Sequence, residues 1–171
     1  SSAASDVYKR QIFTCGYVDE NSAPLFCFGH GLSYTTFELS DFALAEKEVS
    51  TDGILTVSCK VKNTGDREGD EVVQLYYHTK KAHVIRPVKQ LAGFKRISLA
   101  PGEEKKVTFS LNTAQLGYYN EFMEFVVEPT TMDIMIGTSA HDIAFSDVVT
   151  LTGKKVNVMG RRAYTCPVTV E

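Results

Sequence analysis

Apolar and polar residues alternate along most of the chain after residue 36, which predicts half-buried antiparallel strands. The pattern is clearest in ILTVSCKVKN, residues 54–63, where every second residue is apolar. These apolar positions are Leu55, Val57, Cys59 and Val61. We therefore expect one face of this strand in the core and the other in contact with solvent.

Turn residues interrupt the alternation at short intervals. NTGDREGD at 63–70 precedes the strand-like EVVQLYYHT at 71–79. Pro101 and Gly102 separate GFKRISLA from KKVTFSLN; Pro fixes φ at the first central position of a turn, and Gly accepts a positive φ at the second. Each of these points predicts a chain reversal between neighbouring strands.

Three further strand-like runs occupy residues 37–45, 117–129 and 132–139. Together these runs indicate about seven short strands, and no stretch predicts a helix of more than two turns. Short strands separated by turns favour a two-sheet antiparallel sandwich over a parallel sheet with connecting helices. We therefore predict an all-β sandwich domain over residues 36–147.

The two ends of the chain differ from this pattern. SSAASDVYKRQ, residues 1–11, lacks the apolar region of a signal peptide, and we expect it to be non-native or disordered. Residues 12–35 have the character of a linker. Residues 148–171 form a C-terminal extension with two weak strand-like runs, and the sequence leaves open whether they complete the sandwich or trail from it.

Composition narrows the classes of partner. The chain is 43% hydrophobic and 23% charged, with a formal net charge of −3, and no apolar run is long enough to cross a bilayer. Basic residues are scattered singly or in pairs, so neither nucleic acid nor a membrane is expected as a partner. The four cysteines (Cys15, Cys27, Cys59 and Cys166) are too few and too widely spaced for the disulfide framework of a small secreted protein.

Several residues could in principle carry chemistry. The closest acidic pairs, such as Glu103 with Glu104, lie in turns or on polar faces and are best interpreted as solvated carboxylates. Cys27 and His30 have C-x-x-H spacing, which is not diagnostic of a metal site. We expect no catalytic residue, no metal and no cofactor.

Aromatic residues could form a sugar-stacking surface, but Trp is absent. Tyr76 and Tyr77 point to opposite sides of one strand, so at least one of them is expected in the core.

The segment PLFCFGHGLSYTTFELSDF, residues 24–42, resembles the sequence that joins the second catalytic-core domain of family 3 glycoside hydrolases to their C-terminal domain. That family usually shows a form close to P-L-[FY]-P-F-G-[YH]-G-L-S-Y-T-x-F, and only Cys27 departs from it, where Pro is usual. Tyr often replaces His at position 30 in that motif, which argues against an obligate metal ligand. The likeness continues in order through residues 61–76, 86–111 and 118–143, and covers about residues 17–145.

The resemblance implies a fibronectin type III-like sandwich of about seven strands. Family 3 enzymes are retaining glycosidases that use two carboxyl groups. Their nucleophile lies in an N-terminal barrel and their acid in the following α/β domain, and no position here matches the motifs around either group. The implied function is a non-catalytic accessory domain of a β-glucosidase or β-xylosidase acting in polysaccharide breakdown. The alternative is a stand-alone carbohydrate-binding or adhesion module.

On this resemblance, residues 12–35 are a linker from an α/β domain, and the expected partners are the catalytic domains of the same polypeptide. Related enzymes are often secreted or periplasmic, but the compartment, the sugar specificity and the oligomeric state stay open. Apolar side chains are dense in residues 24–34, more so than in a freely solvated linker, which predicts an inter-domain interface. The candidate interface residues are Leu25, Phe26, Phe28, Gly29, His30, Gly31, Leu32 and Tyr34. The 79–90 loop is expected to project from the sandwich, toward the catalytic domains.

Overall fold

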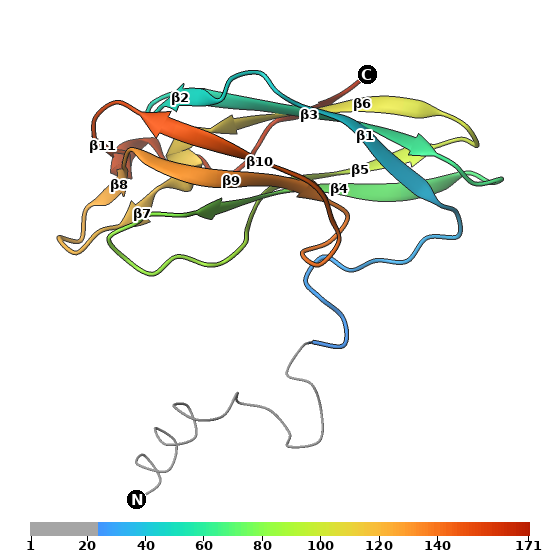
Figure 1. Ribbon diagram of the computed structural model, residues 1–171, viewed down its shortest axis with the longest axis horizontal. Helices are drawn as coiled ribbons and strands as arrows, with labels where there is room; N and C mark the ends of the chain where they lie inside the picture. The colour runs from blue at the N-terminus through green and yellow to red at the C-terminus, as the bar shows by residue number, and fades with distance from the viewer. Residues whose placement is uncertain (1–23) are drawn as a thin grey trace, which may run out of the picture.

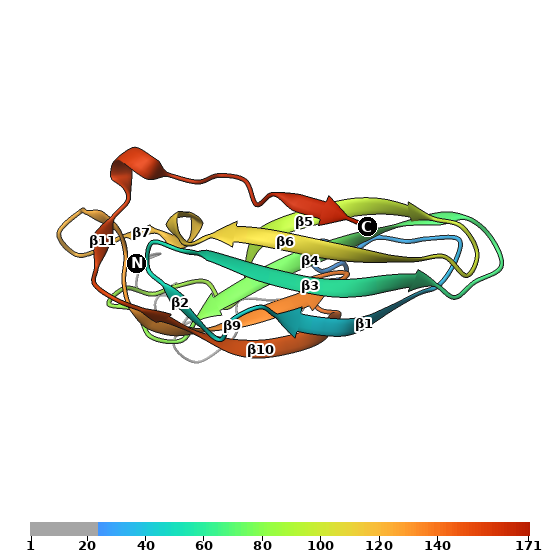
Figure 2. The same ribbon diagram turned by 90° about the horizontal axis from the view of Figure 1, so that it is seen from above.

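The computed structural model describes residues 24–171, which form a two-layer β-sandwich (Figures 1 and 2). One layer is a four-stranded sheet in the order β1-β3-β6-β12. Its strands are β1 (Phe37–Leu44), β3 (Ile54–Asn63), β6 (Glu104–Asn112) and β12 (Val168–Val170). The predicted all-β sandwich is confirmed.

The second layer is a five-stranded sheet in the order β2-β10-β9-β4-β5. Its strands are β2 (Glu48–Ser50), β10 (Ile143–Thr152), β9 (Thr130–Gly137), β4 (Gly69–Thr79) and β5 (Gln90–Leu99). Strand β2 pairs with β10 in parallel. The sequence predicted antiparallel sheets, so this one pairing differs from the prediction. The other pairings in the two large sheets are antiparallel.

The core lies between the two sheets and follows the alternation of the sequence. In β3 the four apolar side chains that were expected inside are fully buried, and Cys59 is among them. The inward residues of β6 (Val107, Phe109 and Leu111) and of β4 (Val73, Leu75 and Tyr77) complete the facing surfaces. The strand register inferred from period two is therefore confirmed in β3.

A third, small sheet closes one end of the sandwich and contains β7 (Tyr118–Tyr119), β8 (Phe125–Val127) and β11 (Val156–Asn157). The run expected at 117–129 is therefore a hairpin and not one strand. Its turn is held by Asn120, whose Oδ1 accepts hydrogen bonds from the backbone N–H groups of Phe122 and Glu124, both at 3.0 Å. Two short 3₁₀ turns, Thr113–Leu116 and Met159–Arg161, complete the elements.

The boundary expected at residue 147 is wrong, because it falls inside strand β10. Alternation continues through this point, and Val149 and Leu151 are buried in the core. Val158 is also buried there, and β12 adds to the edge of β6. The question that the sequence left open is answered: residues 148–171 complete the sandwich.

Asn63 joins three segments at one end of the sandwich and is fully buried. Its Nδ2 donates to the carbonyls of Arg67 and Leu99, and its Oδ1 accepts from the Thr35 hydroxyl and the Gly65 N–H. Its backbone also bonds with Gly102 and Glu103, in the Pro-Gly turn between β5 and β6. The NTG and PGE sequence blocks therefore meet in one corner, and they fix the chain just before β1.

Within residues 24–171 no helix is long and apolar enough to span a membrane.

Candidate docking site

The segment of residues 24–35 crosses the outer side of the five-stranded sheet before entering β1 (Figure 1). It has no strand or helix of its own. Its large apolar side chains are 66–94% exposed. These exposed residues are Leu25, Phe26, Phe28, Leu32 and Tyr34.

Backbone hydrogen bonds hold the middle of this segment on the sheet. The Phe28 carbonyl accepts from the Ala140 N–H at 2.9 Å, and the Gly29 carbonyl accepts from Gln74 Nε2 at 3.0 Å. Gln74 Nε2 also donates to the Thr138 carbonyl, and the Tyr76 hydroxyl donates to Gln74 Oε1. One buried glutamine on the outer face of β4 therefore links this strand to the segment and to the β9–β10 connection.

Gly29 is required for this close approach. Its φ is +78°, and a Cβ added there would lie 2.1 Å from Gln74 Oε1. A Cβ added at Gly31 would meet no atom of the described chain within 4 Å. Of the two glycines flanking His30, only Gly29 approaches another surface within this domain.

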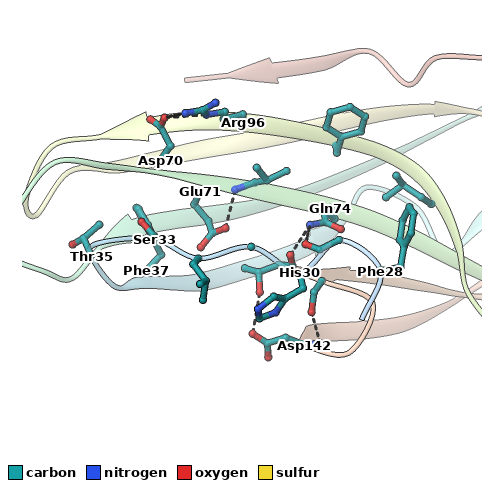
Figure 3. A pocket seen from close by; sticks show the side chains of 18 residues that line it. Phe28, His30, Ser33, Thr35, Phe37, Asp70, Glu71, Gln74, Arg96 and Asp142 are labelled. Carbon is teal, nitrogen blue, oxygen red and sulfur yellow. Dashed lines mark hydrogen bonds and ion pairs between the residues drawn. The ribbon is translucent and has the colours of Figure 1, made fainter. Parts of the chain in front are cut away.

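A groove of about 800 Å³ runs between this segment and the outer faces of β4 and β5 (Figure 3). Phe28, Gly29, His30, Gly31 and Leu32 of the predicted site line it. Leu25, Phe26 and Tyr34 lie outside it. Of the eight predicted interface residues, five therefore line the groove and three lie outside it.

Charged groups mark the far end of the groove from Gln74 (Figure 3). Arg96 Nε lies 2.9 Å from Asp70 Oδ2, and the Ser98 hydroxyl donates to Asp70 Oδ1. The hydrogen bond from Ser98 lowers the pKa of Asp70 most, and the hydrogen bond from Arg96 lowers it further. Glu71 differs, because burial raises its pKa and the nearby charge of Asp142 adds to the effect.

The acidic pair Glu103 and Glu104 lies at the start of β6, beside the Pro-Gly turn. Glu103 accepts from the Ala100 N–H and pairs with Lys105 at 3.0 Å, and these contacts lower its pKa. A general acid working near neutral pH needs a raised pKa, so this carboxylate is poorly placed for that role. Among residues 24–171, no three His, Cys, Asp or Glu side chains are grouped closely enough to hold a metal ion.

Tyr76 and Tyr77 are both buried, and Tyr77 lies in the core, so the expectation that at least one of them is a core residue is confirmed. Tyr77 faces the core, whereas Tyr76 is covered from outside, where its hydroxyl reaches Gln74. Sequence reasoning missed Gln74, Thr138 and Ala140. The available signal was a glutamine inside the apolar run EVVQLYY, because a buried amide needs partners.

Comparison with known proteins places this fold in a family. Residues 71–140 match the family model described as the fibronectin type III-like domain. Thermostable beta-glucosidase B of Acetivibrio thermocellus is 47% identical over 134 residues, which is 78% of this chain and 18% of that protein. A putative beta-xylosidase of Formosa agariphila is 45% identical over 127 residues, 74% of this chain and 17% of that protein.

The crystal structure of a beta-glucosidase from Listeria innocua in complex with glucose matches with a TM-score of 0.77 and 36% identity. The match covers 87% of this chain and 20% of that one. This chain thus spans about a fifth of the length of the relatives that it matches. It belongs to the fibronectin type III-like domains of the family 3 glycoside hydrolases.

Proposed function

We propose that this domain is a non-catalytic accessory part of a retaining β-glycosidase of the β-glucosidase or β-xylosidase type. It docks on the α/β domain that precedes it in the same polypeptide, through residues 24–34. The observation that carries this proposal is a backbone fixed on the sheet by Gln74 and Ala140 beside five exposed large apolar side chains. Large apolar side chains exposed together in one short segment are typical of interaction sites.

The energetics favour docking. Because the backbone around Phe28 and Gly29 is already hydrogen-bonded, binding orders little additional chain, and less entropy is lost. Burying each exposed Leu or Phe contributes about 1.5–3 kcal/mol of favourable transfer free energy. Aromatic residues are enriched in such contacts.

Two experiments test the proposal. The coding sequence upstream of this segment should encode a barrel and an α/β domain, and the 171-residue chain alone should release no p-nitrophenol from aryl β-glucosides or β-xylosides. Turnover that disappears when an acidic residue of this chain is replaced would overturn the assignment.

Docking itself is tested by Leu25→Asp combined with Leu32→Asp in the complete polypeptide. We expect the glycosidase activity of the complete polypeptide to decay with a shorter half-life at elevated temperature, because the contact between the two domains is weakened. Ile54→Asp is the matched control, since Ile54 is an exposed aliphatic residue on β3 of the other sheet. Equal effects from both changes would contradict docking through residues 24–34.

A glycan array separates this function from a stand-alone carbohydrate-binding module. Specific binding of an oligosaccharide by the isolated chain, lost on replacement of groove residues such as Phe94 or Arg96, would favour that second class.

A further inference from the structure

The loop of residues 80–89, between β4 and β5, lies on the same side of the molecule as residues 24–34 (Figure 1). Lys89 Nζ donates to the Ala140 carbonyl, while the Ala140 N–H donates to the Phe28 carbonyl. The end of the loop and residues 24–34 therefore both contact Ala140, in the connection between β9 and β10.

The loop is tied to the sandwich at several points. Thr130 Oγ1 donates to the Lys81 carbonyl at 2.6 Å, and the Lys80 N–H donates to the Thr131 carbonyl at 3.0 Å. Near the other end, His78 Nδ1 lies 3.1 Å from the Pro87 carbonyl oxygen. Such contacts restrict the number of conformations available to the loop.

Arg86 anchors the centre of the loop. Its Nη2 lies 3.4 Å from the Tyr77 hydroxyl and 3.5 Å from the Leu116 carbonyl oxygen. Its guanidinium carbon sits 4.7 Å from the centroid of the Tyr118 ring, in a cation–π contact. These contacts hold the centre of the loop on the sandwich.

Ile85 and Val88, one and two residues away from Arg86, are the outward side chains. Ile85 is fully exposed and Val88 is 76% exposed. Two aliphatic side chains held in water by a loop that is itself anchored form a preorganised contact surface.

We propose that the loop of residues 80–89 is the second arm of the docking surface. With residues 24–34 it receives an apolar patch of the preceding domain. The occupant follows from chain direction, because the blue segment through which the described chain enters β1 lies on this side of the sandwich (Figure 1). This inference rests on the proposed accessory function and extends its interface.

Amide hydrogen exchange of the 171-residue chain and of the complete polypeptide tests the second arm. Peptides covering 24–34 and 80–89 should both exchange about tenfold more slowly, or slower still, in the complete polypeptide. Protection of 24–34 without protection of 80–89 would overturn the second arm and leave the proposed function standing. Protection of neither would overturn both.

Varying the concentration of the isolated chain distinguishes self-association from contact with the preceding domain. If 80–89 became protected in the isolated chain as its concentration rose, with a matching increase in sedimentation coefficient, a second copy of this chain would be the occupant. That result would overturn the assignment to the preceding domain.

The variant Ile85→Asp with Val88→Asp gives an independent measurement. Because both side chains are exposed, we expect the Tm of the isolated chain to stay within about 2 °C of the wild type. In the complete polypeptide, the half-life of glycosidase activity at elevated temperature should fall about threefold or more in this double variant. The control Ile54→Asp should leave that half-life unchanged. An unchanged half-life in the double variant would reject the second arm.

Discussion

Gly29 shows how one residue can decide whether an exposed segment stays on a sheet. Its positive φ and its contact with Gln74 both exclude a side chain, whereas Gly31 two residues later meets nothing. The two glycines of the Gly-His-Gly motif therefore have different physical roles within this domain.

Gly29→Ala should release residues 24–34 from the sheet, because a non-Gly residue at positive φ costs about 1–2 kcal/mol and the added Cβ displaces Gln74. We expect the amides of His30 and Ala140, whose hydrogen bonds depend on this geometry, to exchange about tenfold faster. Gly31→Ala is the matched control and should leave both rates unchanged. Similar rates in the two variants would show that Gly29 does not hold the segment.

Cys59 and Lys60 are neighbours on opposite faces of β3. Cys59→Ala should lower the free energy of unfolding by about 1 kcal/mol, because it removes fully buried volume. Burial also raises the pKa of this thiol to about 12, consistent with a role as a small apolar side chain.

Lys60→Ala should cost less, because its ion pairs with Asp41 and Glu104 lie in solvent. Urea unfolding of the two variants measures both changes. A larger loss from Lys60→Ala would mean that the outward ion pairs outweigh the core contact.

Strands that the sequence predicted share one property, which is a long alternation of apolar and polar residues. β3 and β6 run for nine or ten residues with a clean inward face, so their type and register could be inferred locally. β2 has three residues, too few for periodicity to be recognised, and β12, also of three residues, falls in a run that is only weakly strand-like. Their pairing depends on β10 and β6, which are distant in sequence.

In the candidate site, too, local features could be predicted from the sequence and distant contacts could not. The dense apolar residues and the glycines of 24–34 are local features, and they were identified from the sequence. The hydrogen-bond partners Gln74 and Ala140 lie more than 40 residues away in the chain, so only the folded topology brings them to Phe28 and Gly29.

Strand β10 provides a test of the corrected boundary. A chain that ends at Asp147 should show no cooperative unfolding transition, because it loses the second half of β10 and the buried Val149, Leu151 and Val158. Each such side chain contributes about 1.5–3 kcal/mol of burial, and together they approach the whole stability of a small domain. Calorimetry distinguishes the outcomes: a retained sharp transition in the truncated chain would restore the boundary at 147.

At the scale of the whole molecule, stability should fall in acid. In the folded state the pKa values of Asp70, Glu103, Glu124 and Asp147 are lowered, chiefly by hydrogen bonds from neighbouring hydroxyl, amide or ammonium groups. A lowered folded-state pKa gives stability that is present above the unfolded pKa of about 4 and is lost as the pH falls through the folded value. The urea midpoint should therefore decrease between pH 6 and pH 3.

Glu71 acts with the opposite sign, since burial raises its pKa and protonation in acid favours the folded state. Glu71→Gln should make the loss in acid steeper, whereas Asp70→Asn should make it shallower. A midpoint that rises toward pH 3 in the wild type would contradict the dominance of the lowered carboxyl groups.

The two ends of the described chain leave the sandwich on different sides. Residues 24–34 lie against the five-stranded sheet, and β12 with Glu171 lies at the four-stranded sheet (Figure 1). A fluorophore, an affinity tag or a surface-immobilisation handle attached after Glu171 would therefore lie away from residues 24–34. Immobilisation on a solid support through a handle attached after Glu171 should leave residues 24–34 accessible to a binding partner.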